Sequence, residues 1–306
     1  MRKNIQLMLT ACSLMLMIAM APGCGRPQGR GIAPDGKPGT AQKAGGSIQV
    51  KGSDTMVNLG KAWAQAFMTK YPDSQVAITG GGSGTGIAAL IQGTTDIAQS
   101  SRTIKPEEIE AAKKNGIESK EFLAGYDGIS VIVNPANPVQ SLTLEQLADI
   151  FTGKITNWNM VGGNDGKIVI LSREVNSGTH VYFKEHVLNK GDSKGTVEFS
   201  ADALMMPSSQ AIADEVASNP NTIGYSGMGY VSEKQKAVPI AKDKNTEAIM
   251  PTMENVLSAS YPISRPLFLY TKGEPEGTVK QFMDFVLSAE GQEIVKNEGF
   301  VPLKHQ

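Results

Sequence analysis

The sequence has only two cysteines, Cys12 and Cys24, and both lie within its first two dozen residues. The rest of the chain therefore has no disulfide framework, no zinc-finger cysteines and no cysteine nucleophile. Histidine is also scarce, because His180, His186 and His305 are the only three. The sequence has neither an H-x-x-x-H pair nor an acidic cluster, so it predicts no metal site.

An excess of charge of either sign is absent as well. The chain has 29 basic and 30 acidic residues, a formal net charge of −1, and 40% hydrophobic residues. This balance argues against nucleic-acid binding and against general disorder, so a charged ligand has to be bound by local groups. A length of 306 residues fits two domains, since roughly 150 residues per domain is usual.

The N-terminus has the pattern of an export signal. Arg2 and Lys3 precede an apolar run over 7–21, which is too short for a comfortable membrane span. Ala21-Pro22-Gly23-Cys24 follows and resembles a bacterial lipobox, in which the cysteine is lipidated and becomes the new N-terminus. We therefore predict a lipoprotein signal peptide over 1–24, with lipidation at Cys24 as the anchor.

Two alternatives to this cleavage site stay open. Leu9-Thr10-Ala11-Cys12 matches the lipobox letters slightly better but leaves almost no apolar core before it. An ordinary cleaved signal near Ala21 is the other alternative.

A flexible tether is predicted over 25–46. This segment has seven glycines and three prolines and almost nothing large and apolar. The chain has no later apolar run of spanning length. We expect the protein to act outside the cytoplasm, in the periplasm or at the cell surface, held at the membrane by the lipid.

From residue 47 onward, predicted strands alternate with predicted helices, which indicates a parallel or mixed α/β sheet. The apolar residues Leu59, Trp63 and Phe67, for example, repeat every four positions, as on a helix. The strands are expected at 47–51, 75–79, 96–98, 129–133, 167–171, 222–225 and 265–270. The helices are expected at 57–71, 85–92, 106–115, 144–151, 178–188, 208–218, 278–287 and 290–297.

Three polar loops stand between a predicted strand and a predicted helix, at 52–56, 80–86 and 173–179. Free N–H groups and the helix dipole favour an anion at a helix N-terminus, and glycine lets the anion come close. Serine and threonine add hydroxyl donors, and Arg173 adds a planar fork that can bind two oxygens of a tetrahedral anion. One such loop alone is explained by helix capping, but three that converge predict an oxyanion site.

Enzymatic alternatives fit these loops less well. The glycine loop lacks the lysine of a phosphate-binding P-loop, and the acid expected about 20 residues after a dinucleotide motif is missing. A secreted phosphoester hydrolase using Ser83 or Ser177 needs a base, and only His180, three residues after Ser177, is near in sequence. Ser83 is not in a G-x-S-x-G elbow, because Thr85 occupies the last position.

With these loops, the sequence resembles the periplasmic substrate-binding proteins of the high-affinity phosphate ABC importer, over about 46–302. Arg173-x-x-x-Ser177-Gly178-Thr179 is the strongest element, and 52–55, 82–84, 96–102 and 261–267 resemble further segments of that family. The resemblance implies phosphate contacts from Ser53, Asp54, Thr55, Ser83, Ser101, Arg102, Arg173, Ser177, Gly178 and Thr179.

The resemblance also implies a fold and a function. The fold is α/β, a type II periplasmic-binding-protein-like fold with two lobes and a two-segment hinge near Asn134 and Tyr261. Domain 1 then comprises 47–134 and 261–306, and domain 2 comprises 135–260. The implied function is capture of inorganic phosphate and its delivery to a membrane permease by a monomer, with no cofactor and no catalysis.

The sequence departs from the family at one position. Well-known members have an aspartate where Ser101 stands, and that carboxylate accepts the proton of hydrogen phosphate and repels sulfate. Asp54 occupies a position that is often threonine, so the proton acceptor has either moved across the site or Asp54 only caps the following helix. Receptors for sulfate, molybdate or arsenate, and a phosphate sensor without a transporter, stay open as alternatives.

Overall fold

The structure, a computed structural model, describes residues 45–304. The predicted signal peptide, Cys24 and the tether up to residue 44 lie outside the described residues. Within residues 45–304, no helix combines the length and the apolar character that crossing a membrane requires.

The described chain is built on a nine-stranded mixed sheet in the order β2-β1-β3-β11-β4-β8-β6-β7, with β9 paired to β4. A separate two-stranded sheet pairs β10 with β5. The strands are β1 (Ser47–Gly52), β2 (Gln75–Thr79), β3 (Ile97–Ser100), β4 (Ser119–Val133), β5 (Leu142–Thr143), β6 (Val169–Arg173), β7 (Leu204–Met206), β8 (Thr222–Gly227), β9 (Lys236–Ala237), β10 (Ile240–Ala241) and β11 (Ser264–Lys272).

Helices connect most of these strands, as the sequence predicts. They are α1 (Val57–Lys70), α2 (Ser83–Ile91), α3 (Pro106–Lys114), α4 (Leu144–Phe151), α5 (Gly178–Phe183), α6 (Ser209–Ser218), α7 (Met253–Leu257), α8 (Gly277–Leu287) and α9 (Ala289–Asn297). Short 3-10 turns η1 (Asp54–Met56), η2 (Trp158–Val161) and η4 (Met228–Tyr230) add to them. The predicted helix over 178–188 is α5 followed by a π-helical turn, η3 (Lys184–Leu188).

Two hydrophobic cores lie on either side of the middle of the sheet. One contains Leu59, Trp63 and Phe67 of α1 and packs them against α8, α9 and the first strands. The other surrounds β8 and packs Phe151 and Phe183 against Tyr225. The buried face predicted for 57–71 is therefore confirmed.

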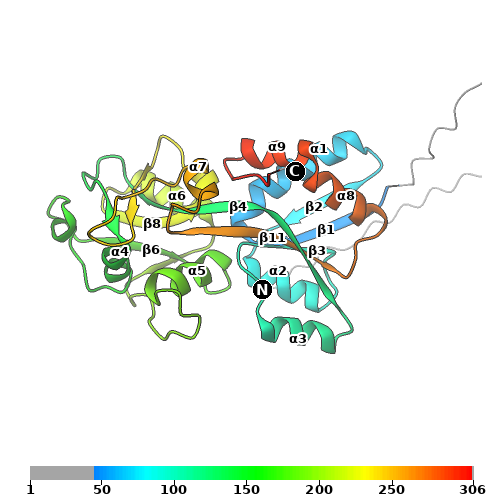
Figure 1. Ribbon diagram of the computed structural model, residues 1–306, viewed down its shortest axis with the longest axis horizontal. Helices are drawn as coiled ribbons and strands as arrows, with labels where there is room; N and C mark the ends of the chain where they lie inside the picture. The colour runs from blue at the N-terminus through cyan, green and yellow to red at the C-terminus, as the bar shows by residue number, and fades with distance from the viewer. Residues whose placement is uncertain (1–44, 305–306) are drawn as a thin grey trace, which may run out of the picture. The chain divides into compact units, whose positions relative to one another are not determined.

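The strands β4 and β11 run side by side between these two groups of helices (Figure 1). The first part of β4 pairs with β11, and its last five residues, Ile129–Val133, pair with β8. Ile129 and Val131 belong to the core around β8, together with Tyr261 and Ile263. The predicted domain boundaries stay a prediction, but two paired strands are the connection between the two cores.

The prediction of β4 was too short, because only 129–133 was expected as a strand. The strand begins at Ser119, and its first half carries Lys120, Glu121 and Gly125, which interrupt the apolar pattern. These residues are held in the strand by backbone pairing with β11 rather than by their own burial pattern.

Candidate functional site

The loops predicted to form the site follow the carboxyl ends of neighbouring strands. β1 pairs in parallel with both β2 and β3, so the loops after these three strands meet at one edge of the sheet. In the other half of the sheet, beyond β11 and β4, β6 ends at Arg173 and α5 begins at Gly178. These loops and helix starts carry all ten predicted residues, Ser53, Asp54, Thr55, Ser83, Ser101, Arg102, Arg173, Ser177, Gly178 and Thr179.

Direct side-chain contacts join the two groups of loops. The hydroxyls of Thr55 and Thr179 are 2.8 Å apart, and both residues are buried. Nη2 of Arg173 donates to Oδ2 of Asp54 at 2.7 Å. The structure therefore brings loops 52–56 and 173–179 together, as the sequence predicts.

Three predicted serines form a buried cluster. Ser53 Oγ donates to Ser101 Oγ at 2.9 Å, and the Ser101 N–H donates to Ser83 Oγ at 3.1 Å. All three residues are at most 1% exposed. Because each hydroxyl can turn to donate or to accept, this cluster can satisfy an anion without a net charge of its own.

Gly178 lies directly against this cluster. A Cβ at this position would come 2.3 Å from Ser83 Oγ and 2.8 Å from Ser101 Oγ. Only glycine therefore lets the start of α5 approach the serines so closely. The close approach places the start of α5 beside the hydroxyls of Ser83 and Ser101, and Ser177 Oγ caps this helix by accepting from the His180 N–H.

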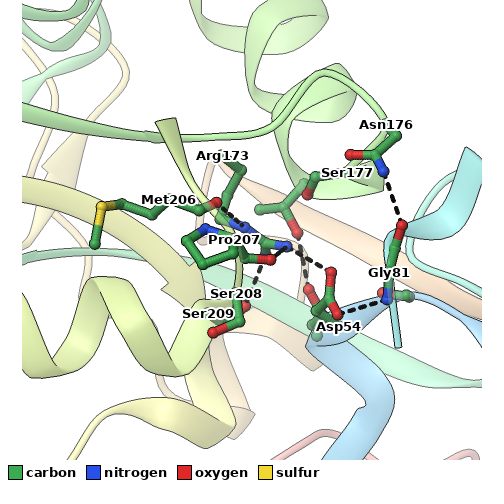
Figure 2. A network of polar contacts seen from close by, with 12 residues as sticks. Asp54, Gly81, Arg173, Asn176, Ser177, Met206, Pro207, Ser208 and Ser209 are labelled. Carbon is green, nitrogen blue, oxygen red and sulfur yellow. Dashed lines mark hydrogen bonds and ion pairs between the residues drawn. The ribbon is translucent and has the colours of Figure 1, made fainter. Parts of the chain in front are cut away.

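Arg173 is held on several sides by protein atoms (Figure 2). Its Nε donates to Met206 O at 3.2 Å, and its Nη1 donates to Ser209 Oγ at 3.2 Å. Its Nη2 donates to both Asp54 Oδ2 and Pro207 O. Four of the five N–H groups of a guanidinium are thus engaged, which leaves one on Nη1 for an anion. The expectation that Arg173 binds two oxygens therefore requires one of these bonds to be given up.

The electrostatics around Arg173 follow from its burial. Burial lowers the pKa of the Arg173 guanidinium, and the neighbouring Asp54 carboxylate works in the opposite direction. Because arginine stays protonated in proteins, the free-energy cost of burying this cation has to be offset by the negative charge of Asp54.

Asp54 does not cap the helix that follows it. Its Oδ1 accepts from the Gly81 N–H at 2.9 Å, and its Oδ2 accepts from Arg173 (Figure 2). Neither η1 nor α1 has a side-chain cap bond. The capping explanation of Asp54 is therefore wrong, and the carboxylate instead joins β1, the glycine loop and β6.

Arg102 lies apart from the other predicted residues in its hydrogen bonding. Its two terminal nitrogens bind both carboxylate oxygens of Glu108 on α3, at 2.8 and 2.7 Å. Within the described residues, its guanidinium makes no hydrogen bond to any of the other nine. Glu108 Oε2 also accepts from the Lys105 N–H, which closes the capping box of α3.

His180 is not placed as a base for either serine. Its Nδ1 lies 3.4 Å from Ser172 Oγ, whose hydroxyl also bonds Tyr225 Oη at 2.8 Å. Burial lowers the pKa of His180 and raises the pKa of Tyr225 to about 12. Among the described residues, Ser83 Oγ and Ser177 Oγ have no histidine side chain as a hydrogen-bond partner. No group of three or more metal-ligating side chains occurs in this part of the chain either.

Sequence reasoning missed two contributions to this site. The side-chain amide of Asn176 donates to Gly81 O at 2.8 Å (Figure 2). It also donates to Thr85 Oγ1 at 3.2 Å, and the backbone carbonyl of Asn176 accepts from the Gly84 N–H. Arg265 is buried beneath the two threonines and binds Thr179 Oγ1 at 2.9 Å. The available signal for Arg265 was a cation at the start of an apolar strand, since such a residue needs a buried partner.

Comparisons with known proteins give a consistent result. Residues 38–290 match the family model described as a PBP superfamily domain. The chain is 31% identical over 307 residues to the phosphate-binding protein PstS of Bacillus subtilis, covering 99% of this chain and 95% of that protein.

Solved structures agree with the family model. A phosphate ABC transporter substrate-binding protein from Clostridium perfringens, solved with bound phosphate, is 39% identical, with a TM-score of 0.76. The match covers 84% of this chain and 100% of that chain. An ABC-type phosphate transport receptor from Vibrio cholerae is 29% identical, with a TM-score of 0.66 and the same two coverages.

Proposed function

This chain belongs to the PBP superfamily, among the phosphate-binding proteins of the PstS type, and we propose that it captures inorganic phosphate for an ABC importer. It acts outside the cytoplasm and hands the ion to the membrane permease. It is a receptor and not an enzyme, since the relatives named above are all binding or transport receptors.

The observation that carries this proposal is the meeting of two sets of donors. Thr55 and the serines come from loops after β1, β2 and β3, whereas Arg173 and Thr179 come from β6 and α5, yet the two threonines are within 2.8 Å. A tetrahedral anion has oxygens on all sides, so it is suited to donors that converge from two directions. The ligand-binding residues we propose are Ser53, Asp54, Thr55, Ser83, Ser101, Arg173, Ser177, Gly178 and Thr179. Of the ten predicted residues we leave out Arg102, because both of its terminal nitrogens bind Glu108.

We propose that the chain passes from one lobe to the other through the paired strands β4 and β11. Because the two donor sets lie on opposite sides of this pair, ligand binding has to draw the lobes together. The protein is a monomer tethered through a lipid on Cys24, which becomes the N-terminal residue once the part of the signal peptide before it is removed. This part of the proposal rests on the lipobox resemblance.

Calorimetric titration of the purified protein, freed of carried-over ligand, tests the function. Phosphate, sulfate, arsenate and molybdate are titrated at one pH and one ionic strength. Phosphate is expected to bind more tightly than sulfate, and scattering of the same sample is expected to show a more compact body with phosphate. Preference for another oxyanion would replace the substrate, and an absence of binding to all four would refute the receptor.

A further inference from the structure

Arg265 and Asp127 form an ion pair in which both side chains are fully buried. The two residues face each other across β11 and β4. Nε and Nη2 of Arg265 donate to Asp127 Oδ2 at 3.0 and 2.8 Å. The pair therefore lies in the two strands that join the hydrophobic cores.

The same guanidinium reaches three residues of the proposed phosphate site. Its Nη2 donates to Thr179 Oγ1 at 2.9 Å and to Thr55 Oγ1 at 3.3 Å. Its Nη1 donates to Ser101 O at 2.9 Å. The ring of Tyr182, from α5, lies 5.8 Å from its Cζ. Arg265 thus touches elements of both donor sets at once.

Counting hydrogens shows what these contacts do to the threonines. A guanidinium only donates, and Nη2 has two N–H groups for three acceptors. Because Nη2 also binds Asp127 Oδ2 at 2.8 Å, Thr179 Oγ1 at 2.9 Å and Thr55 Oγ1 at 3.3 Å share the remaining N–H, and both accept from it. The two hydroxyls also share one hydrogen across their 2.8 Å contact. Of two hydroxyl hydrogens, one is used between the threonines, and the other has to point away from Arg265. The pair of threonines therefore has one hydroxyl hydrogen left to donate in a direction away from Arg265.

We propose that Arg265, balanced by Asp127, is a positioning residue that holds Thr55 and Thr179 with one hydroxyl hydrogen directed at the bound anion. This inference rests on the proposed function. Because the ion pair has no net charge, it acts through the orientation of the threonines. Arg265 also gives the two donor sets a common hydrogen-bond partner in β11, one of the two strands that join the hydrophobic cores.

The test replaces the pair jointly as Arg265→Gln/Asp127→Asn. Removing one partner of a buried ion pair is strongly destabilising, whereas a joint neutral replacement is often tolerated. The amide oxygen at position 127 can still accept from the Met228 N–H, which Asp127 Oδ1 binds at 3.0 Å. Thr271→Val is the control, since Thr271 is a buried polar residue of β11 whose hydroxyl bonds Gly273 O, outside the site.

Inorganic phosphate is titrated calorimetrically into the full chain, and thermal unfolding is recorded without phosphate. The joint variant is expected to bind about fivefold more weakly or worse, and Thr271→Val is expected to bind as the parent does. A double-mutant cycle with Thr179→Val decides whether Arg265 acts through the threonine. The threonine change should cost about fivefold in the parent and less than about twofold in the joint variant.

Equal affinity of a folded joint variant and the parent, or fully additive costs in the cycle, would overturn the inference. If the joint variant does not fold, Arg265→Lys gives the same decision. It keeps a charge opposite Asp127, but one ammonium has too few directed donors to hold both threonines and Ser101 O. Unchanged affinity of that variant would also overturn the inference. A parent protein that does not bind phosphate refutes the proposed function itself, which is a separate outcome.

Discussion

Replacing Arg173 by alanine is expected to weaken phosphate binding by at least about 2 kcal/mol, or roughly 30-fold, since about 1.4 kcal/mol corresponds to tenfold. Two effects of the structure add up to this figure. The variant loses the one N–H that Arg173 has left for an anion, and a hydrogen bond to a charged group contributes about 1.5–3 kcal/mol. It also leaves the Asp54 carboxylate without its 2.7 Å partner beside the phosphate.

Two further variants separate these effects. Arg173→Lys keeps the charge but not the planar fork that binds Met206 O, Ser209 Oγ and Asp54 together, so it should recover only part of the loss. Arg173→Ala/Asp54→Asn removes the unpaired carboxylate, so it should bind phosphate more tightly than Arg173→Ala alone. The difference between these two variants measures the repulsion from Asp54 less the hydrogen bond that its carboxylate accepts from hydrogen phosphate.

The assay is calorimetric titration of phosphate, with thermal unfolding in the absence of ligand as its control. Breaking a buried ion pair costs about 3–5 kcal/mol of stability, so the folded fraction of each variant has to be established first. A folded Arg173→Ala protein that bound phosphate as tightly as the parent would refute the assignment of Arg173 to the site.

Three other outcomes are expected. Asp54→Asn should weaken phosphate and relatively improve sulfate in parallel titrations, because only hydrogen phosphate donates a proton to the carboxylate; an unchanged ratio would contradict this role. Asn176→Ala removes the hydrogen bond from the Asn176 side chain to Gly81 O, which joins the two donor sets and does not involve the ligand. The dissociation constants of phosphate and arsenate should therefore rise by the same factor, and unequal factors would indicate that Asn176 contacts the ligand directly. Burial lowers the pKa of His180 from its usual 6.5, so the unfolded chain binds a proton that the native state does not. The free energy of unfolding, measured with urea, should therefore fall as the pH drops through 6.5, and His180→Gln should flatten this dependence.

The sequence predicted the site as far as local structure determines it. The boundaries between a strand and a helix are read from short windows of polar and apolar residues, so the junctions that carry Ser53, Ser83 and Arg173 were found. Their exact limits differ, because Ser83 already begins α2 and Arg173 still belongs to β6. The pairing of Arg173 with Asp54 joins residues 119 positions apart. No pattern in either loop encodes that contact, because it depends on how the two donor sets approach each other.

Arg265 shows the same limit more strongly. It pairs with a residue 138 positions away, and its strand was recognised only as an apolar run. Residues 119–128 of β4, which include Asp127, were not recognised as a strand at all. An ion pair across two strands becomes predictable only once the register of those strands is known, and the register here includes a shift between Leu267 and Phe268.

Both arginines beside the proposed ligand already have carboxylate partners, since Asp54 compensates Arg173 and Asp127 compensates Arg265. The side chains of the site therefore bring little net positive charge to an anion, in keeping with the net charge of −1 of the whole chain. Affinity then has to come from hydroxyl and backbone N–H donors at fixed positions, which bind in a site shielded from water. Such a site distinguishes anions by their hydrogens more than by their charge. A ligand proton that faces Asp54 meets an acceptor, whereas one that faces the threonine donor does not. The position of a single proton on the ligand is therefore the property on which selectivity should depend.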